Sequence, residues 1–162
     1  MAEIDIREAR WPADRADVAA LFREYGSYVA SLGYDLAFQG FAAELAALPG
    51  KYAPPQGGLL IARRAGAALG CVAFRPLAPE ICEMKRLYVR PEARGSRLGE
   101  ILCRELMRRA HRAGYRAMRL DTAAPMRAAR ALYLSLGFKP IPPYYDNPYG
   151  DMAFFEALLA PG

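Results

Sequence analysis

Residues 83–99 read Glu-Met-Lys-Arg-Leu-Tyr-Val-Arg-Pro-Glu-Ala-Arg-Gly-Ser-Arg-Leu-Gly and join an apolar strand to a turn that contains glycine. The strand ends before Pro91, and after the turn Leu102, Leu106 and Ala110 recur at helical spacing. In a turn such as 94–99, backbone N–H groups converge at the start of a helix whose dipole adds partial positive charge. The stretch therefore predicts a site for a phosphate or pyrophosphate in front of a helix over 97–113.

The glycine spacing excludes two common kinds of phosphate loop. The turn has no Gly-Lys-Ser/Thr ending to hold magnesium and a γ-phosphate, and its glycines are not spaced Gly-x-Gly-x-x-Gly within a first βαβ unit. The segment therefore resembles neither a nucleoside triphosphate loop nor a dinucleotide loop.

Composition indicates one ordinary domain spanning 1–162. The chain has 162 residues, of which 54% are apolar, enough for a substantial core. A net charge of +5 favours anionic ligands. Cys71, Cys82 and Cys103 each lie in apolar stretches, without metal-ligand or disulfide spacing, and are expected to be reduced core residues of a cytoplasmic protein. No apolar run approaches the ~18 residues of a membrane span, so we expect no membrane association. Because no metal-ligand spacing is present, we expect no metal.

Hydrophobic periodicity gives the order of elements β-αα-βββ-α-β-α-ββ. This order predicts an α/β fold with a mixed central sheet, in which the middle strands are consecutive and the later ones are connected through helices. The expected strands are 4–9, 58–64, 69–75, 80–89, 116–121, 139–141 and 152–158, and the expected helices are 14–33, 35–48, 97–113 and 125–136.

Two separated motifs resemble those of the GNAT superfamily, the acetyl-CoA-dependent N-acetyltransferases. The first is 83–99, and the second is Ala-Leu-Tyr-Leu-Ser-Leu-Gly-Phe at 131–138, similar to the family's Leu-Tyr-x-x-x-Gly-Phe signature. The element order is also the family's, so the resemblance covers essentially the whole chain. It implies a GNAT-like sheet with a splayed strand pair for CoA, and transfer of an acetyl group to the primary amine of a small molecule or peptide.

The resemblance assigns cofactor-binding positions. The main chain of the strand would pair with the pantetheine arm, and backbone amides of the turn would hold the pyrophosphate. The family has glycine where this chain has Arg97, so we expect Gly95 to take the positive φ and Arg97 to lie in the first helical turn with its side chain outward. Many members also carry asparagine where this chain has Met126. The implied cofactor-binding residues are Leu87, Tyr88, Val89, Arg94, Gly95, Ser96, Arg97, Leu98, Gly99, Glu100 and Tyr133.

The resemblance also implies catalytic roles. The Leu87 amide would donate to the thioester oxygen, and Tyr133 would be the general acid for the CoA thiolate. Glu83 and Asp121 are alternative general bases for the protonated amine, with Glu83 preferred. Either carboxylate could instead have a structural role, for example in an ion pair with Arg86 or Arg119, or as a strand-end cap.

Recognition of the acceptor is expected where the sequence is least typical of the family. Candidates are Tyr25 in the first helix and Tyr144, Tyr145 and Asn147 in the proline-rich segment 142–148. We do not expect a nucleic-acid partner, because no stacking aromatics are interleaved with the arginines. The resemblance allows a homodimer, although no segment specifies an interface. The alternative function is a CoA-binding sensor or partner-binding module without catalysis.

Overall fold

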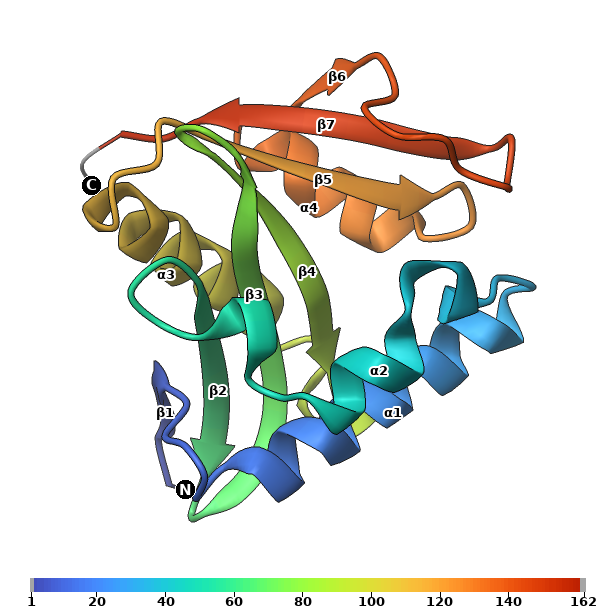
Figure 1. Ribbon diagram of the computed structural model, residues 1–162. Coiled ribbons are helices and arrows are strands. Elements are labelled where there is room, and N and C mark those ends of the chain that lie inside the picture. The colour runs from blue at the N-terminus through green and yellow to red at the C-terminus, as the bar shows by residue number, and fades with distance from the viewer. Residues whose placement is uncertain (1, 161–162) are drawn as a thin grey trace.

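The computed structural model describes residues 2–160, whose strands form one seven-stranded sheet in the order β1-β2-β3-β4-β5-β7-β6 (Figure 1). The strands are β1 (Ile4–Glu8), β2 (Gly58–Arg64), β3 (Ala67–Ala78), β4 (Ile81–Val89), β5 (Ala117–Ala123), β6 (Lys139–Ile141) and β7 (Met152–Leu158). The α-helices are α1 (Arg15–Ser31), α2 (Phe41–Ala46), α3 (Leu98–Arg112) and α4 (Arg127–Ser135). Every predicted strand is present, and the mixed α/β fold is confirmed.

Strand direction follows from the connections. The hairpin between β2 and β3 turns through Ala65 and Gly66, both at positive φ, as two-residue hairpins require. All neighbouring strands are antiparallel except β4 and β5, which are parallel because α3 connects them. The predicted turn and crossover are both confirmed.

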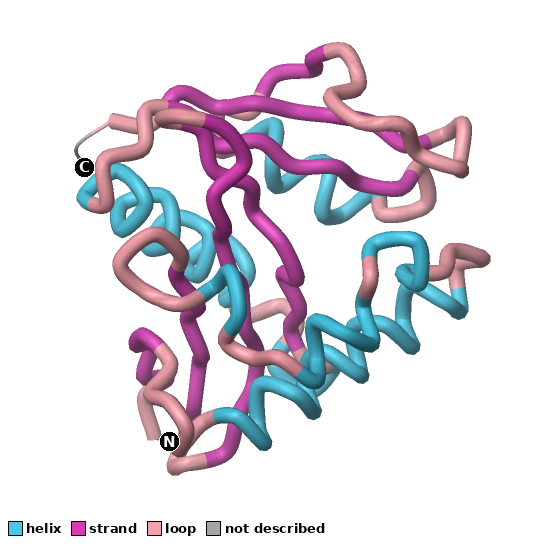
Figure 2. The backbone as a smooth tube through the Cα atoms, in the orientation of Figure 1, coloured by secondary structure: helices cyan, strands magenta, loops and turns pink. Residues whose placement is uncertain are grey.

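Helices cover the two faces of the sheet, and each face has its own apolar core (Figure 2). On one face, Leu102 and Leu106 of α3 pack with Tyr133 of α4. On the other, Leu21 and Phe22 of α1 pack on β2 and β3. Among residues 2–160, no helix is long and apolar enough to cross a membrane.

The predicted helix over 35–48 is wrong as a single element. Leu36–Gln39 is a 3₁₀ turn that Asp35 caps by accepting a hydrogen bond from the Ala37 amide at 2.8 Å. Gly40 then adopts φ +71°, which ends that turn before α2 begins. Because a left-handed residue cannot continue an α-helix, the segment divides into two short helices.

The expected splayed strand pair is confirmed. Strands β4 and β5 pair only from Ile81 with Ala117 to Glu83 with Arg119, although β4 continues to Val89. Beyond that point the two strands diverge, as Figure 1 shows, and their facing edges are separated. Beyond Glu83 and Arg119 the facing edges of β4 and β5 are therefore not paired with each other.

Candidate active site

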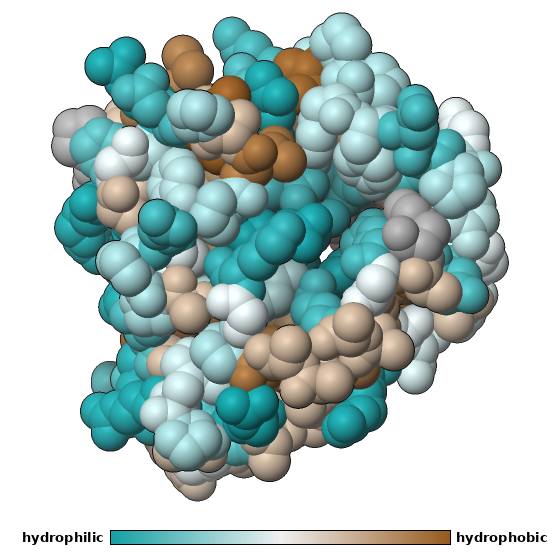
Figure 3. Space-filling model, viewed as in Figure 1, coloured by the Kyte–Doolittle hydropathy of each residue, from teal (hydrophilic) through white to brown (hydrophobic). Residues whose placement is uncertain are grey.

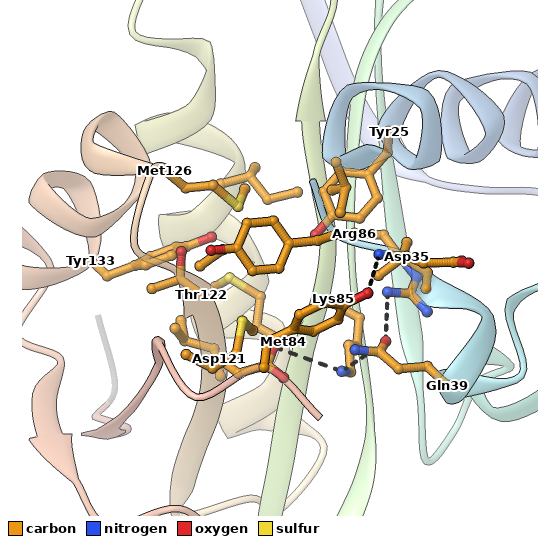
Figure 4. A pocket seen from close by; sticks show the side chains of 18 residues that line it. Tyr25, Asp35, Gln39, Met84, Lys85, Arg86, Asp121, Thr122, Met126 and Tyr133 are labelled. Atoms are coloured by element: carbon orange, nitrogen blue, oxygen red, sulfur yellow. Dashed lines mark hydrogen bonds and ion pairs between the residues drawn. The ribbon is translucent and has the colours of Figure 1, made fainter. Parts of the chain in front are cut away.

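A cavity lies where β4 and β5 diverge, with α4 on one side and the end of α1 and the following turn on the other (Figure 4). The predicted site residues Tyr25, Leu87, Asp121 and Tyr133 all line it. They come from four elements and are brought together only by the fold. The remaining lining residues are Val29, Tyr34, Asp35, Leu36, Gln39, Met84, Lys85, Arg86, Leu120, Thr122, Ala123, Met126, Tyr149 and Met152.

Tyr133 reaches into this cavity from α4 (Figure 4). Its ring packs edge-on against Phe138 with centroids 5.8 Å apart, which fixes the orientation of the side chain. Burial raises the pKa of Tyr133 well above its usual value. The hydroxyl therefore remains protonated at neutral pH and is available as a proton donor.

A β-bulge in β4 orients the amide of Leu87. Cys71 pairs with Tyr88 and Ala73 with Lys85, so β4 contains one residue more than β3 over this stretch. Within the bulge Arg86 adopts φ +61°, a conformation that costs a non-glycine residue about 1–2 kcal/mol.

The direction of the Leu87 N–H follows from the same bulge. The Cys71 Sγ donates to the Arg86 carbonyl oxygen at 3.4 Å, so this carbonyl is directed toward β3. In a trans peptide the N–H points opposite to the C=O. The Leu87 N–H is therefore directed away from β3, toward the space between β4 and β5.

The turn between β4 and α3 has the geometry of an anion site. Gly95 lies at φ +84°, as predicted, and the helix begins at Leu98. The Arg94 Nε donates to the Val89 carbonyl at 3.1 Å, and Ser96 Oγ to the Ala93 carbonyl at 2.5 Å. Both side chains shape the turn, which leaves the amides at the start of α3 to receive an anion.

The backbone position of Arg97 differs from the predicted one. The residue precedes the helix as its N-cap at φ +62°, not in the first helical turn, so both Gly95 and Arg97 adopt positive φ. The outward direction of its side chain is confirmed: it is 77% exposed and its guanidinium lies 3.1 Å from Glu100. The departure from glycine at 97 therefore places backbone strain in the turn.

Replacing Arg97 with glycine should increase the free energy of unfolding by about 1 kcal/mol, because glycine adopts this φ without a Cβ clash and the exposed ion pair contributes little. Arg97→Ala is the matched control, since it removes the same ion pair but keeps the Cβ. Urea unfolding of the three proteins tests this. Equal gains in both variants would contradict the strain at 97.

The two candidate bases occupy different positions. Asp121 lines the cavity of Tyr133, whereas Glu83 is 2% exposed and lines a neighbouring cavity. Lys85, itself buried, lies between them, with its Nζ 3.5 Å from Glu83 and 3.9 Å from Asp121. Among residues 2–160, no cluster of three or more His, Cys, Asp or Glu side chains is placed to hold a metal ion.

Glu83 is held in its ionised form. Burial by itself would raise the pKa of Glu83, but Lys85, the Tyr144 hydroxyl and Arg75 outweigh it and lower the pKa below its usual value. The Arg75 Nε lies 3.0 Å from the carboxylate. The suggested ion-pair partners are wrong, because Arg86 pairs with Glu44 and Arg119 with Glu156.

The proline-rich segment covers the two carboxylates. Tyr144 donates to Glu83 at 2.6 Å, and Tyr145 donates to Asp121. The Asn147 amide donates to the Tyr145 hydroxyl at 2.8 Å and so supports it. Figure 3 shows this face of the molecule hollowed between the β5–β7 part and the α1–α2 part, with hydrophilic residues around the hollow.

Sequence reasoning missed several polar residues of the cavity, among them Lys85, Arg86, Gln39 and Thr122. Lys85 and Arg86 lie inside the recognised motif, but their burial could not be inferred from their charge. Gln39 comes from the 3₁₀ turn and accepts from both of them. Thr122 is 3% exposed, and its hydroxyl has no hydrogen-bond partner within residues 2–160.

The Thr122 hydroxyl should therefore reduce the stability of the free protein. Thr122→Val, which keeps the shape of the side chain, is expected to raise the free energy of unfolding by about 1 kcal/mol, because it removes an unsatisfied buried hydroxyl. Thr122→Ser retains the hydroxyl and serves as the control. A destabilised valine variant in urea unfolding would indicate that the hydroxyl is satisfied in solution.

Comparisons with known proteins find similar acetyltransferases. A family model described as the acetyltransferase (GNAT) family matches residues 8–138. An uncharacterized N-acetyltransferase of Schizosaccharomyces pombe is 44% identical over 161 residues, covering 98% of this chain and 97% of its own.

Solved structures share the fold. A putative acyl-CoA N-acyltransferase of Klebsiella pneumoniae superposes with a TM-score of 0.70 at 29% identity, over 99% of this chain and 100% of its own. The PaiA N-acetyltransferase of Thermoplasma acidophilum, solved in complex with coenzyme A, gives 0.75 at 19% identity, over 96% and 99%.

Proposed function

The chain belongs to the GNAT family of acetyltransferases, and from this we propose that residues 1–162 act as one N-acetyltransferase domain that transfers the acetyl group of acetyl-CoA directly to a primary amine of a small molecule or peptide. Buried, unpaired Cys71, Cys82 and Cys103 support our proposal that it works in the cytoplasm. The observation that carries the proposal is the convergence of Tyr133 and the Leu87 amide on the cavity between β4 and β5.

The residues present fit the cofactor. The turn before α3 offers amides to the pyrophosphate, and the diverging edge of β4 offers main chain to the pantetheine arm. The CoA complex of the Thermoplasma relative supports the same ligand here. Acetyl-CoA supplies an acyl group on a thiolate leaving group.

We assign the Leu87 N–H to the thioester oxygen, where one such donor lowers the barrier by about 3 kcal/mol. In the transfer, the general base would take a proton from the amine as its nitrogen bonds to the acetyl carbon, and the Tyr133 hydroxyl would give its proton to the CoA sulfur as the C–S bond breaks. No nucleophilic side chain is used, so no acyl-enzyme forms.

For the base we favour Asp121 over Glu83, which reverses the preference from the sequence. Asp121 shares the cavity with Tyr133, whereas the lowered pKa of Glu83 and its ion pairs make that carboxylate a weak proton acceptor. Tyr144 and Tyr145, over the two carboxylates, would form the wall of the acceptor site.

Calorimetric titration with acetyl-CoA tests cofactor binding, with ATP and NAD as controls. Release of the CoA thiol in the presence of a panel of small amines and peptides tests transfer. Absence of acetyl-CoA binding at millimolar concentration would refute the proposal. Binding without thiol release against any amine would instead support a non-catalytic CoA-binding module.

A further inference from the structure

We propose that Glu44 and Gln39 are positioning residues: through the side chain of Arg86 they hold the bulge in β4, and with it the direction of the Leu87 amide. The inference rests on the proposed function, because it gives that amide a task in the reaction. It goes further by assigning control of the amide to two residues of a segment more than 40 positions away in sequence.

Each of the three guanidinium nitrogens of Arg86 donates a hydrogen bond. Arg86 is 3% exposed, and its guanidinium forms a two-pronged ion pair with Glu44, with Nε–Oε2 and Nη2–Oε1 distances of 2.9 and 3.1 Å. The remaining nitrogen, Nη1, donates to the Gln39 Oε1 at 3.0 Å. The guanidinium carbon also lies 5.0 Å from the centre of the Phe41 ring and 5.9 Å from that of Tyr25.

These contacts matter because the backbone of Arg86 is in an unfavourable conformation. At φ +61°, a residue with a Cβ remains only where its surroundings fix it. If Arg86 returned to the ordinary extended region, the 86–87 peptide would rotate. The Leu87 N–H would then no longer point away from β3.

Two groups fix this peptide from opposite sides. From β3, the Cys71 thiol donates to the Arg86 carbonyl at 3.4 Å. From the helical side, Glu44 and Gln39 hold the guanidinium. The Cys71 contact is a weak hydrogen bond, whereas the Arg86–Glu44 pair is charged, two-pronged and largely buried, so the second restraint dominates.

The same pair attaches α2 to the sheet. This helix is six residues long and has no fully buried side chain, and Glu44 is its ionic link to β4. Gln39, in the turn just before α2, lines the cavity, and the position of α2 is thereby coupled to the orientation of the amide. A displaced α2 would release Arg86 and impair catalysis without disturbing the turn that holds the cofactor phosphates.

Glu44→Gln tests the inference, because it keeps the size of the side chain and removes one charge of the pair. We expect kcat to fall about 10-fold, while KM and the calorimetric dissociation constant for acetyl-CoA change less than about two-fold, since the amide is needed most in the transition state. Arg86→Lys, which keeps the charge but not the two-pronged geometry, should behave alike. The double variant should lose little more than either single one, because both break the same interaction.

Glu24→Gln is the matched control. It breaks the Arg90–Glu24 ion pair of 2.6 Å, which ties α1 to the residue after β4, and alters a 3.3 Å contact of Glu24 with the Tyr88 hydroxyl, but neither contact involves the side chain or the carbonyl of Arg86. Its kcat should equal that of the wild type. A loss of kcat as large as that of Glu44→Gln would assign the effect to general loosening of the helices.

Amide NMR of the full chain provides a readout without turnover. The Leu87 resonance should shift on addition of acetyl-CoA in the wild type and shift much less in Glu44→Gln. A folded Glu44→Gln protein with wild-type kcat and a wild-type Leu87 shift would overturn the inference. A wild type that binds acetyl-CoA but acetylates no amine would refute the proposed function instead, and the NMR comparison would still decide the positioning role.

Discussion

Tyr133→Phe is expected to lower kcat about 10²–10³-fold, because the phenylalanine ring cannot give a proton to the departing thiolate. The dissociation constant of CoA should stay within about two-fold, since the ring itself is retained. Its edge-on contact with Phe138 and its place in the core below α4 are independent of the hydroxyl. Single-turnover kinetics with thiol detection, together with calorimetric titration of CoA, would measure both quantities.

The control for Tyr133→Phe is Tyr115→Phe, which also removes one hydroxyl, here one that donates to the Gln56 carbonyl outside the cavity. Its kcat should not change.

Because burial raises the pKa of Tyr133, its hydroxyl stays protonated across the neutral range. Ionisation of Tyr133 should therefore not lower the wild-type rate between pH 7 and about 10. A wild-type kcat in Tyr133→Phe would exclude Tyr133 as the general acid. A loss of CoA affinity as large as the loss of kcat would indicate that the hydroxyl binds the cofactor and does not act as an acid.

The sequence predicted the parts of the site that depend on local pattern. The strand, the turn at Gly95 and the helix after it follow from apolar periodicity and glycine placement over neighbouring residues, and Tyr133 lies in a short motif of its own. The break at Gly40 also had a local signal, which the apolar residues of 35–48 obscured. Such features need no knowledge of distant contacts.

The remaining features depend on contacts between distant segments. The left-handed conformation of Arg86 is stabilised by Glu44, 42 residues earlier, and no local preference for arginine indicates it. Likewise, the ion-pair partners of Glu83 became clear only when the register of β3 placed Arg75 opposite it. Which charged residues of a motif have a structural role depends on long-range pairing and burial, and composition does not contain this information.

Replacing Asp121 should lower activity, whereas replacing Glu83 should lower stability. Together the two results distinguish a general base from a structural charge. Asp121→Asn is expected to lower kcat/KM about 10²-fold at pH 7. At this pH an acceptor amine with a pKa of ~10 is almost entirely protonated and needs a base to remove its proton. The deficit should shrink as pH rises toward ~10, where the free amine no longer needs a base. A rate profile of variant against wild type measures this, and a deficit that is constant with pH would argue against Asp121.

Glu83→Gln should instead lower the free energy of unfolding by about 3 kcal/mol, because it leaves the buried Lys85 and its neighbour Arg75 without their shared carboxylate. Glu24→Gln, at a more exposed pair, should cost less than about 1 kcal/mol.

Since the folded protein lowers the pKa of Glu83, the stability advantage of the wild type is fully present above the unfolded pKa of about 4.5 and is lost as pH falls through the folded pKa. Urea unfolding of wild type and variant at pH 7 and at lower pH should therefore converge on acidification. A kcat/KM deficit of Glu83→Gln that shrinks with rising pH, without this loss of stability, would make Glu83 the base and leave Asp121 as the partner of Tyr145.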